Sequence, residues 1–98
     1  MVKKISFSPE ANQRLYEIVT YIVDKWSVKT AENFLEILDN KLSHIKLFPY
    51  SFPQLENKEE VRKCVLTTQI TLYYRLFNDE AELITFFDTR QDLEKLNL

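Results

Sequence analysis

The complete absence of glycine is the feature that most restricts this sequence of 98 residues. Phosphate-binding P-loops, dinucleotide-binding turns, EF-hand loops and the nucleophile elbow of hydrolases all need glycine at fixed positions. The chain also has one histidine and one cysteine, which excludes zinc fingers, four-cysteine zinc sites and metalloproteases that use two histidines. Most enzyme classes with a recognisable motif are therefore excluded, and we expect no metal ion and no cofactor.

The composition indicates one globular domain over residues 1–98. Hydrophobic residues make up 45% of the chain and charged residues 29%, which is the usual balance of a soluble protein. The apolar runs are only a few residues long, so we expect no membrane-spanning segment, and the first residues lack the apolar stretch of a signal peptide. Because Cys64 is the one cysteine, no internal disulfide can form, and we expect a cytoplasmic protein.

Charge is unevenly distributed along the chain. Residues 1–47 carry seven basic and six acidic side chains, whereas residues 48–98 carry six basic and nine acidic ones. Neither part has the basic excess of a protein that coats nucleic acid. A local cationic cleft remains compatible with this distribution.

Two amphipathic helices are predicted, because apolar residues recur at steps of three and four after Ser8 and again after Ser27. Ser8 is suited to the N-cap position and Pro9 to the first helical position. A short strand precedes the first helix at residues 3–7, where polar and apolar residues alternate. The break near Ser27 is short, so the helices are expected to form an antiparallel hairpin. The two apolar stripes are Ala11, Leu15, Ile18, Ile22 and Trp26, and then Ala31, Phe34, Leu35, Leu38, Leu42 and Ile45.

The pattern changes after the prolines at positions 49 and 53, which cannot extend a helix. A polar loop is expected at residues 56–60, and beyond it the apolar period becomes two. Three strands are predicted, at residues 61–66, 70–78 and 82–87, before a tail at residues 88–98. Their short connections predict an antiparallel meander. The fold class is therefore α+β in the order β-α-α-β-β-β, with the helical hairpin packed on one face of a small antiparallel sheet.

The strand at residues 70–78 divides its side chains between two environments, because successive residues point to opposite faces. One face resembles a core and carries Ile70, Leu72, Tyr74 and Leu76. The other face mixes aromatic rings with a cation and is predicted to line a groove; it carries Thr71, Tyr73, Arg75 and Phe77.

Three arginines are candidates for chemistry, because a guanidinium group can hold a phosphate or carboxylate through two hydrogen bonds. They are Arg62, Arg75 and Arg90. Antiparallel pairing would bring such positions within reach of one another. The alternative is that they are surface arginines paired with nearby acids, namely Glu59, Glu60, Asp88 or Asp92. We expect His44 to be a solvent-facing helix residue and Cys64 to be a small buried side chain, because neither has a partner that would activate it.

Five short strings in order resemble the RelE/ParE superfamily of toxins from bacterial type II toxin–antitoxin systems, over nearly the whole chain. They are Phe7-Ser8-Pro9-Glu10-Ala11, Leu47-Phe48-Pro49, Arg62-Lys63-Cys64-Val65, Thr71-Leu72-Tyr73-Tyr74-Arg75 and Phe87-Asp88-Thr89-Arg90-Gln91. The sequence departs from the family pattern after the Phe-Pro step, where the usual glycine is replaced by Tyr50-Ser51-Phe52-Pro53.

The resemblance implies one of two activities. RelE-like members cut mRNA on the ribosome with basic residues and a C-terminal tyrosine or histidine, whereas ParE-like members poison DNA gyrase without accepted catalytic residues. Arg90 matches the RelE-type arginine beyond the last strand. However, Leu66 and Leu96 stand near the positions of a second arginine and of the tyrosine, and the acidic balance also differs from RelE-like nucleases. The ParE-like activity is therefore favoured, which makes catalysis the less expected outcome.

The resemblance also implies the partners: a cognate antitoxin, with DNA gyrase as the target or, in the alternative, the ribosome and its mRNA. A third hypothesis is an inactive binding module of the same fold. The residues expected to bind a partner are Tyr73, Arg75, Phe77, Arg90 and Gln91. Because the chain has more large apolar side chains than a small core hides, we also predict an apolar groove for an extended or helical antitoxin segment.

Overall fold

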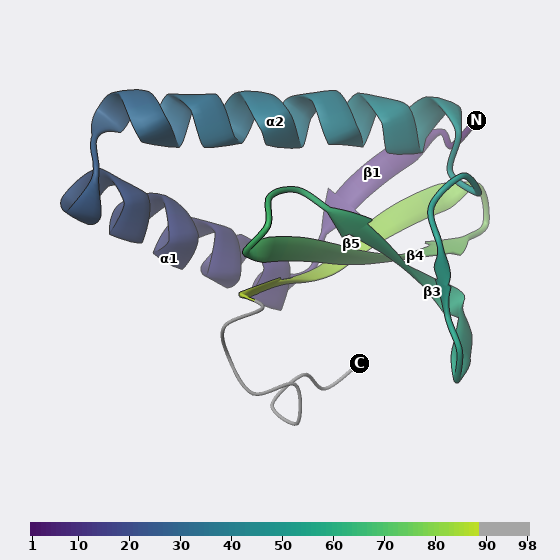
Figure 1. Ribbon diagram of the computed structural model, residues 1–98. Helices are drawn as coiled ribbons and strands as arrows, with labels where there is room; N and C mark the ends of the chain where they lie inside the picture. The colour runs from purple at the N-terminus through teal and green to yellow at the C-terminus, as the bar shows by residue number, and fades with distance from the viewer. Residues whose placement is uncertain (89–98) are drawn as a thin grey trace.

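The computed structural model describes residues 1–88 and consists of two helices and a five-stranded sheet in that range (Figure 1). The elements in chain order are β1 (Lys4–Phe7), α1 (Pro9–Lys25), α2 (Val28–Leu47), β2 (Gln54–Leu55), β3 (Lys58–Val65), β4 (Ile70–Phe77) and β5 (Glu80–Asp88). The predicted α+β class and the order of the main elements are confirmed. The prediction of a polar loop at residues 56–60 was wrong in part, because β3 already begins at Lys58 and the two-residue strand β2 precedes it.

Two serines begin the helices, as their sequence context predicts. The side chain of Ser8 accepts a hydrogen bond from the backbone of Ala11 at 3.0 Å, and Ser27 accepts one from Thr30 at the same distance. Each bond satisfies a backbone donor that the first helical turn leaves without a partner. Ser8 also donates its hydroxyl to the carbonyl oxygen of Ile84 at 2.7 Å, so the start of α1 is attached to β5.

The strand order is β1-β5-β4-β3-β2. The meander β3–β4–β5 is antiparallel, as predicted, but β1 pairs with β5 in parallel, with Lys4 opposite Glu80. The sheet is therefore mixed, and the expectation of a wholly antiparallel sheet was wrong. The physical reason is the long connection between β1 and β5, which contains both helices and three strands and therefore leaves ample chain for the crossover that parallel neighbours require.

Both helices lie on one face of the sheet (Figure 1), and the main core fills the space between the helices and the sheet. Its largest fully buried side chains are Tyr74, Ile45, Leu72, Leu83 and Cys64. The predicted core face of β4 is confirmed, and most of the two helical stripes pack against it. Two stripe residues differ: Trp26 is 73% exposed and Leu35 is 37% exposed. Trp26 is the C-cap of α1, with non-helical backbone angles, so it no longer continues the stripe.

The opposite face of the sheet is partly closed by a second apolar cluster. Tyr73, Val61 and Phe87 are buried there. The pairing of β4 with β5 shifts register at Tyr73, and Ile84 joins the cluster at this irregularity. The prediction that Tyr73 lines an open groove was therefore wrong, whereas Phe77 is 44% exposed.

The chain makes its turns without glycine, and in one turn this places non-glycine residues in the left-handed backbone conformation. Within residues 1–88, positive φ angles occur only at Asn78 (49°) and Asp79 (61°), in the two-residue turn between β4 and β5. Asparagine and aspartate tolerate this left-handed conformation better than most residues. The turn after the Phe-Pro step, where the family pattern has glycine, needs no positive φ in this chain.

Chemical labelling of Cys64 tests directly whether its side chain is buried in the core. Its thiol is buried, and burial raises its pKa to about 11. Because the thiolate is the reactive form, we expect no reaction with a disulfide reagent at about pH 8 in the folded protein and rapid reaction in denaturant. The Cys64 thiol loses its proton at a lower pH in the unfolded chain than in the folded protein. The free energy of unfolding should therefore fall as pH rises from the ordinary thiol pKa towards the raised pKa of the folded protein. Rapid labelling of the native protein, measured by mass spectrometry, would contradict this placement.

Candidate functional site

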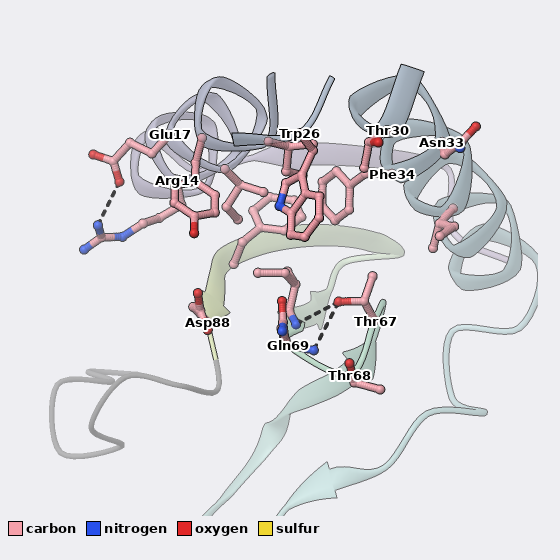
Figure 2. Close-up of a pocket in the computed structure, with 16 residues that line it drawn as sticks. Arg14, Glu17, Trp26, Thr30, Asn33, Phe34, Thr67, Thr68, Gln69 and Asp88 are labelled. Atoms are coloured by element: carbon pink, nitrogen blue, oxygen red, sulfur yellow. Dashed lines mark hydrogen bonds and ion pairs between the residues drawn. The ribbon is translucent and has the colours of Figure 1, made fainter. Parts of the chain in front are cut away.

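A groove of about 720 Å³ lies between the helical hairpin and the β3–β4 turn (Figure 2). In the figure, Trp26 and Phe34 come from the helices on one side, and Thr67 and Gln69 lie on the other. The groove is lined by Arg14, Glu17, Ile18, Tyr21, Ile22, Trp26, Thr30, Asn33, Phe34, Ile37, Thr67, Thr68, Gln69, Ile70, Phe86 and Asp88.

Local hydrogen bonds fix the two rims of the groove. On the sheet side, the Thr67 hydroxyl accepts hydrogen bonds from the backbone of Gln69 at 3.2 Å and of Ile70 at 3.1 Å. On the helical side, Arg14 and Glu17 form an exposed ion pair of 2.9 Å. The hydrogen bonds from Gln13 and Arg14 hold the pKa of the Glu17 carboxyl below its usual value. The rims are therefore polar and preformed, although this exposed ion pair contributes little stability.

The groove is suited to binding rather than to acid–base chemistry. Its interior is mainly apolar, and it includes two large exposed aromatic side chains, Trp26 and Tyr21, the latter 46% exposed. A hydrophobic interior with a polar rim is the usual anatomy of a protein–protein contact. The predicted apolar groove exists, but on the helical side of the sheet rather than on the face of Tyr73. The signal in the sequence was Trp26, a large aromatic residue placed where the first helix must end.

Arg62 lies on the helical side of the sheet, because it is directly opposite Tyr74 in the β3–β4 pairing. Its Nη1 donates hydrogen bonds to the carbonyl oxygens of Tyr50 at 3.1 Å and Phe52 at 2.7 Å, and its guanidinium lies 5.0 Å from the centre of the Tyr50 ring. These contacts attach Arg62 to the turn at residues 48–53, which we call the aromatic turn.

Arg75 lies on the opposite side of the sheet, because it pairs with Val61. It forms an ion pair with Glu82, with both nitrogen–oxygen distances 2.8 Å, and its guanidinium is 5.3 Å from the centre of the Phe77 ring. Arg75 therefore matches the alternative of a surface arginine with an acidic partner, although the partner is not one of the acids named from the sequence. The structure does not bring Arg62 and Arg75 together.

Arg90 and Gln91 lie outside the described residues, and so does Leu96. Leu66 is buried in the main core. His44 is exposed, as expected, and its Nε2 lies 3.1 Å from the Ser51 hydroxyl.

Two further properties concern residues 1–88 as a whole. No three histidine, cysteine or acidic side chains of this range are gathered in a way that could hold a metal ion. Neither of the two described helices combines the length and the apolar character needed to cross a membrane.

Comparison with known proteins agrees with this geometry. A family model for the ParE toxin of the type II toxin–antitoxin system parDE matches residues 5–93. No curated protein matches the sequence significantly.

Solved structures share the fold at low sequence identity. The chromosomal ParDE toxin–antitoxin system from P. aeruginosa has a TM-score of 0.72 at 11% identity, and the match covers 87% of this chain and 94% of that one. A YoeB/ParE toxin from Agrobacterium tumefaciens has a TM-score of 0.64 at 11% identity, covering 87% and 96%. A YoeB–YefM complex from Staphylococcus aureus has a TM-score of 0.60 at 15% identity, covering 85% and 92%.

Proposed function

Because this chain belongs to the ParE toxin family of type II toxin–antitoxin systems, we propose that it inhibits its target by binding and not by cleavage. DNA gyrase is the proposed target, and a cognate antitoxin neutralises the toxin. The similarity to toxin–antitoxin complexes supports a protein partner of this kind.

The placement of the arginines is the observation that supports a non-catalytic toxin. A nuclease that works without a metal needs several cations around one phosphate to stabilise the charge that develops during cleavage. Arg62 and Arg75 lie on opposite faces of the sheet, and Arg75 is already paired with Glu82. Leu66, near the position of a further arginine in RelE-like toxins, is buried.

One set of assays separates the three hypotheses. The chain is expressed alone, and then with the small open reading frame next to its gene. We expect growth to stop and the neighbour to restore it. Purified gyrase should lose its supercoiling activity when the purified toxin is added. In RNA from the arrested cells, primer extension should find no codon-positioned cuts in translated mRNA. Such cuts would establish the RelE-like alternative, and a harmless chain would indicate an inactive binding module.

We propose that the antitoxin occupies the groove with an apolar segment, either helical or extended. The groove is open, mainly apolar and bordered by polar side chains. A segment that becomes ordered on binding would cover Trp26 and Tyr21 and remove their apolar surface from water.

The second proposed contact region includes Arg75, Phe77, Arg90 and Gln91. We expect Arg90→Ala to lower toxicity more than Arg75→Ala, because Arg75 is held by Glu82 while Arg90 matches the family's functional position. The measurement is viable counts after induction, divided by the amount of folded toxin. If Arg90→Ala lowers the melting temperature sharply and leaves toxicity per folded molecule unchanged, Arg90 is a structural residue.

A further inference from the structure

The aromatic turn is held in one conformation by contacts from the sheet. The buried hydroxyl of Tyr74 donates a hydrogen bond to the carbonyl oxygen of Pro49 at 2.8 Å. Arg62 engages the carbonyl oxygens of Tyr50 and Phe52 with one guanidinium nitrogen. Charge-assisted bonds to backbone acceptors are among the stronger hydrogen bonds in proteins. The turn is therefore attached to two neighbouring strands.

The helical side of the aromatic turn is fixed as well. The His44 ring lies 5.7 Å from the Phe48 ring and 5.0 Å from the Phe52 ring, measured between centroids. Ser51 donates its hydroxyl to the carbonyl oxygen of Phe48 at 2.8 Å, and the same hydroxyl oxygen lies within hydrogen-bond distance of His44. Side chains from both the helix and the sheet thus preorganise a short segment without glycine.

This preorganised turn displays large apolar side chains to solvent. Tyr50 is 72% exposed, Phe48 is 61% exposed and the adjacent Leu47 is 54% exposed. None of the three lines the groove. Rigid, exposed aromatic side chains are favoured at protein interfaces, because little conformational entropy is lost when they bind. The surface formed by Leu47, Phe48, Tyr50 and Arg62 is here called the turn surface.

Arg62 gives the turn surface a positive charge. Residues 40–55, which include the aromatic turn, contain Lys41 and Lys46 and no aspartate or glutamate, and Glu60 lies two residues before Arg62 on β3. Arg62 is half-buried and makes no ion pair within the described residues. Its two described hydrogen bonds use Nη1 alone, so Nε and Nη2 can donate hydrogen bonds to an anionic partner. A held guanidinium beside exposed rings is complementary to a carboxylate next to an apolar side chain.

We propose that the turn surface binds an acidic, apolar protein segment, with a carboxylate on Arg62 and apolar side chains on Phe48 and Tyr50. A peptide fits better than a nucleic acid strand, which needs a row of cations along its backbone. The chain has a net charge of −2, and this opposes a long polyanion more than a short acidic segment. The turn surface is distinct from the groove, so this inference does not depend on the proposed toxicity.

The test uses the purified full chain and a short peptide in which glutamate alternates with leucine and phenylalanine. Backbone amide signals followed by NMR should shift at residues 44–52 and at Arg62 on titration. We expect Tyr50→Ala to weaken binding about tenfold, the usual loss at an interface hot spot. Tyr16→Ala is the matched control, because Tyr16 is 70% exposed on α1 and is not part of the turn surface. Thermal melting checks that each variant is folded.

A basic peptide and a DNA strand test which kind of partner the turn surface binds. A peptide of the same design with lysine in place of glutamate should bind at least tenfold more weakly, which tests the charge without any substitution in the turn. Oligo(dT) should not compete with the acidic peptide. The inference is overturned if neither peptide binds, if both bind equally, if oligo(dT) displaces the acidic peptide, or if the shifted signals come from Trp26 and residues 67–70.

Discussion

Replacing Trp26 with glutamate is expected to abolish neutralisation by the cognate antitoxin and to leave a folded, toxic protein. Trp26 is 73% exposed, so its own packing contributes little to the free energy of unfolding. In the groove, a carboxylate would have to lose its water when an apolar antitoxin segment binds, and the one arginine of the described lining, Arg14, is already paired with Glu17. We expect the dissociation constant to rise by about 100-fold or more, as for central aromatic residues in other interfaces.

The measurements are calorimetry with the purified antitoxin and growth of cells that express both proteins. Tyr16→Glu is the matched control, because Tyr16 is an exposed aromatic residue of α1 outside the groove. This control should bind antitoxin normally. Normal neutralisation of the Trp26→Glu protein would exclude the groove as the antitoxin site while the family membership stands. Loss of toxicity in both variants would instead indicate a damaged fold.

Tyr74→Ala is expected to lower the free energy of unfolding more than the other substitutions named above. Tyr74 is fully buried between the helices and the sheet, its ring contacts Phe52, and its hydroxyl donates to the carbonyl oxygen of Pro49. Removal of a buried aromatic ring costs about 3–5 kcal/mol, because the cavity closes only in part. Urea denaturation measures the change, and a loss below about 2 kcal/mol would contradict the central position of this side chain.

Tyr74→Phe separates the ring from the hydroxyl. It keeps the core filled and leaves one buried carbonyl oxygen without its donor, which costs about 1–3 kcal/mol. The pKa of the Tyr74 hydroxyl is raised by burial, so the hydroxyl stays protonated and remains a donor at neutral pH. The Phe variant should also loosen the aromatic turn, which NMR would detect as faster exchange of the amides near Pro49.

Local patterns in the sequence were sufficient to predict the elements of this fold. Ser8 and Ser27 determine where the helices begin, and the alternation along residues 70–77 determines which side chains of β4 enter the core. The position of β1 could not be predicted, because strands of four residues carry no information about their neighbours. Trp26 was placed in the core because a periodic pattern does not indicate at which residue the helical conformation ends.

The candidate site was harder to predict for a related reason. Which face an arginine occupies depends on strand register, and register depends on pairing partners that are distant in the chain. A shift of one residue would have put Arg62 and Arg75 on the same side. The groove is formed by residues of the helical hairpin, the last of them Ile37, and by a turn that begins thirty positions later at Thr67, and no single segment of the sequence contains it.

The parallel pairing of β1 with β5 has a consequence for the order in which the chain folds. The hydrogen bond between Ser8 and Ile84 joins residues that are 76 positions apart. The hairpins β3–β4 and β4–β5 require only short loops to close, whereas β1 and the start of α1 must find a strand near the other end of the domain. The meander is therefore expected to form in the transition state and to serve as the template on which the first strand docks last. On the ribosome, the helices would emerge long before the sheet that holds them, and the native packing could form only after β5 has been synthesised.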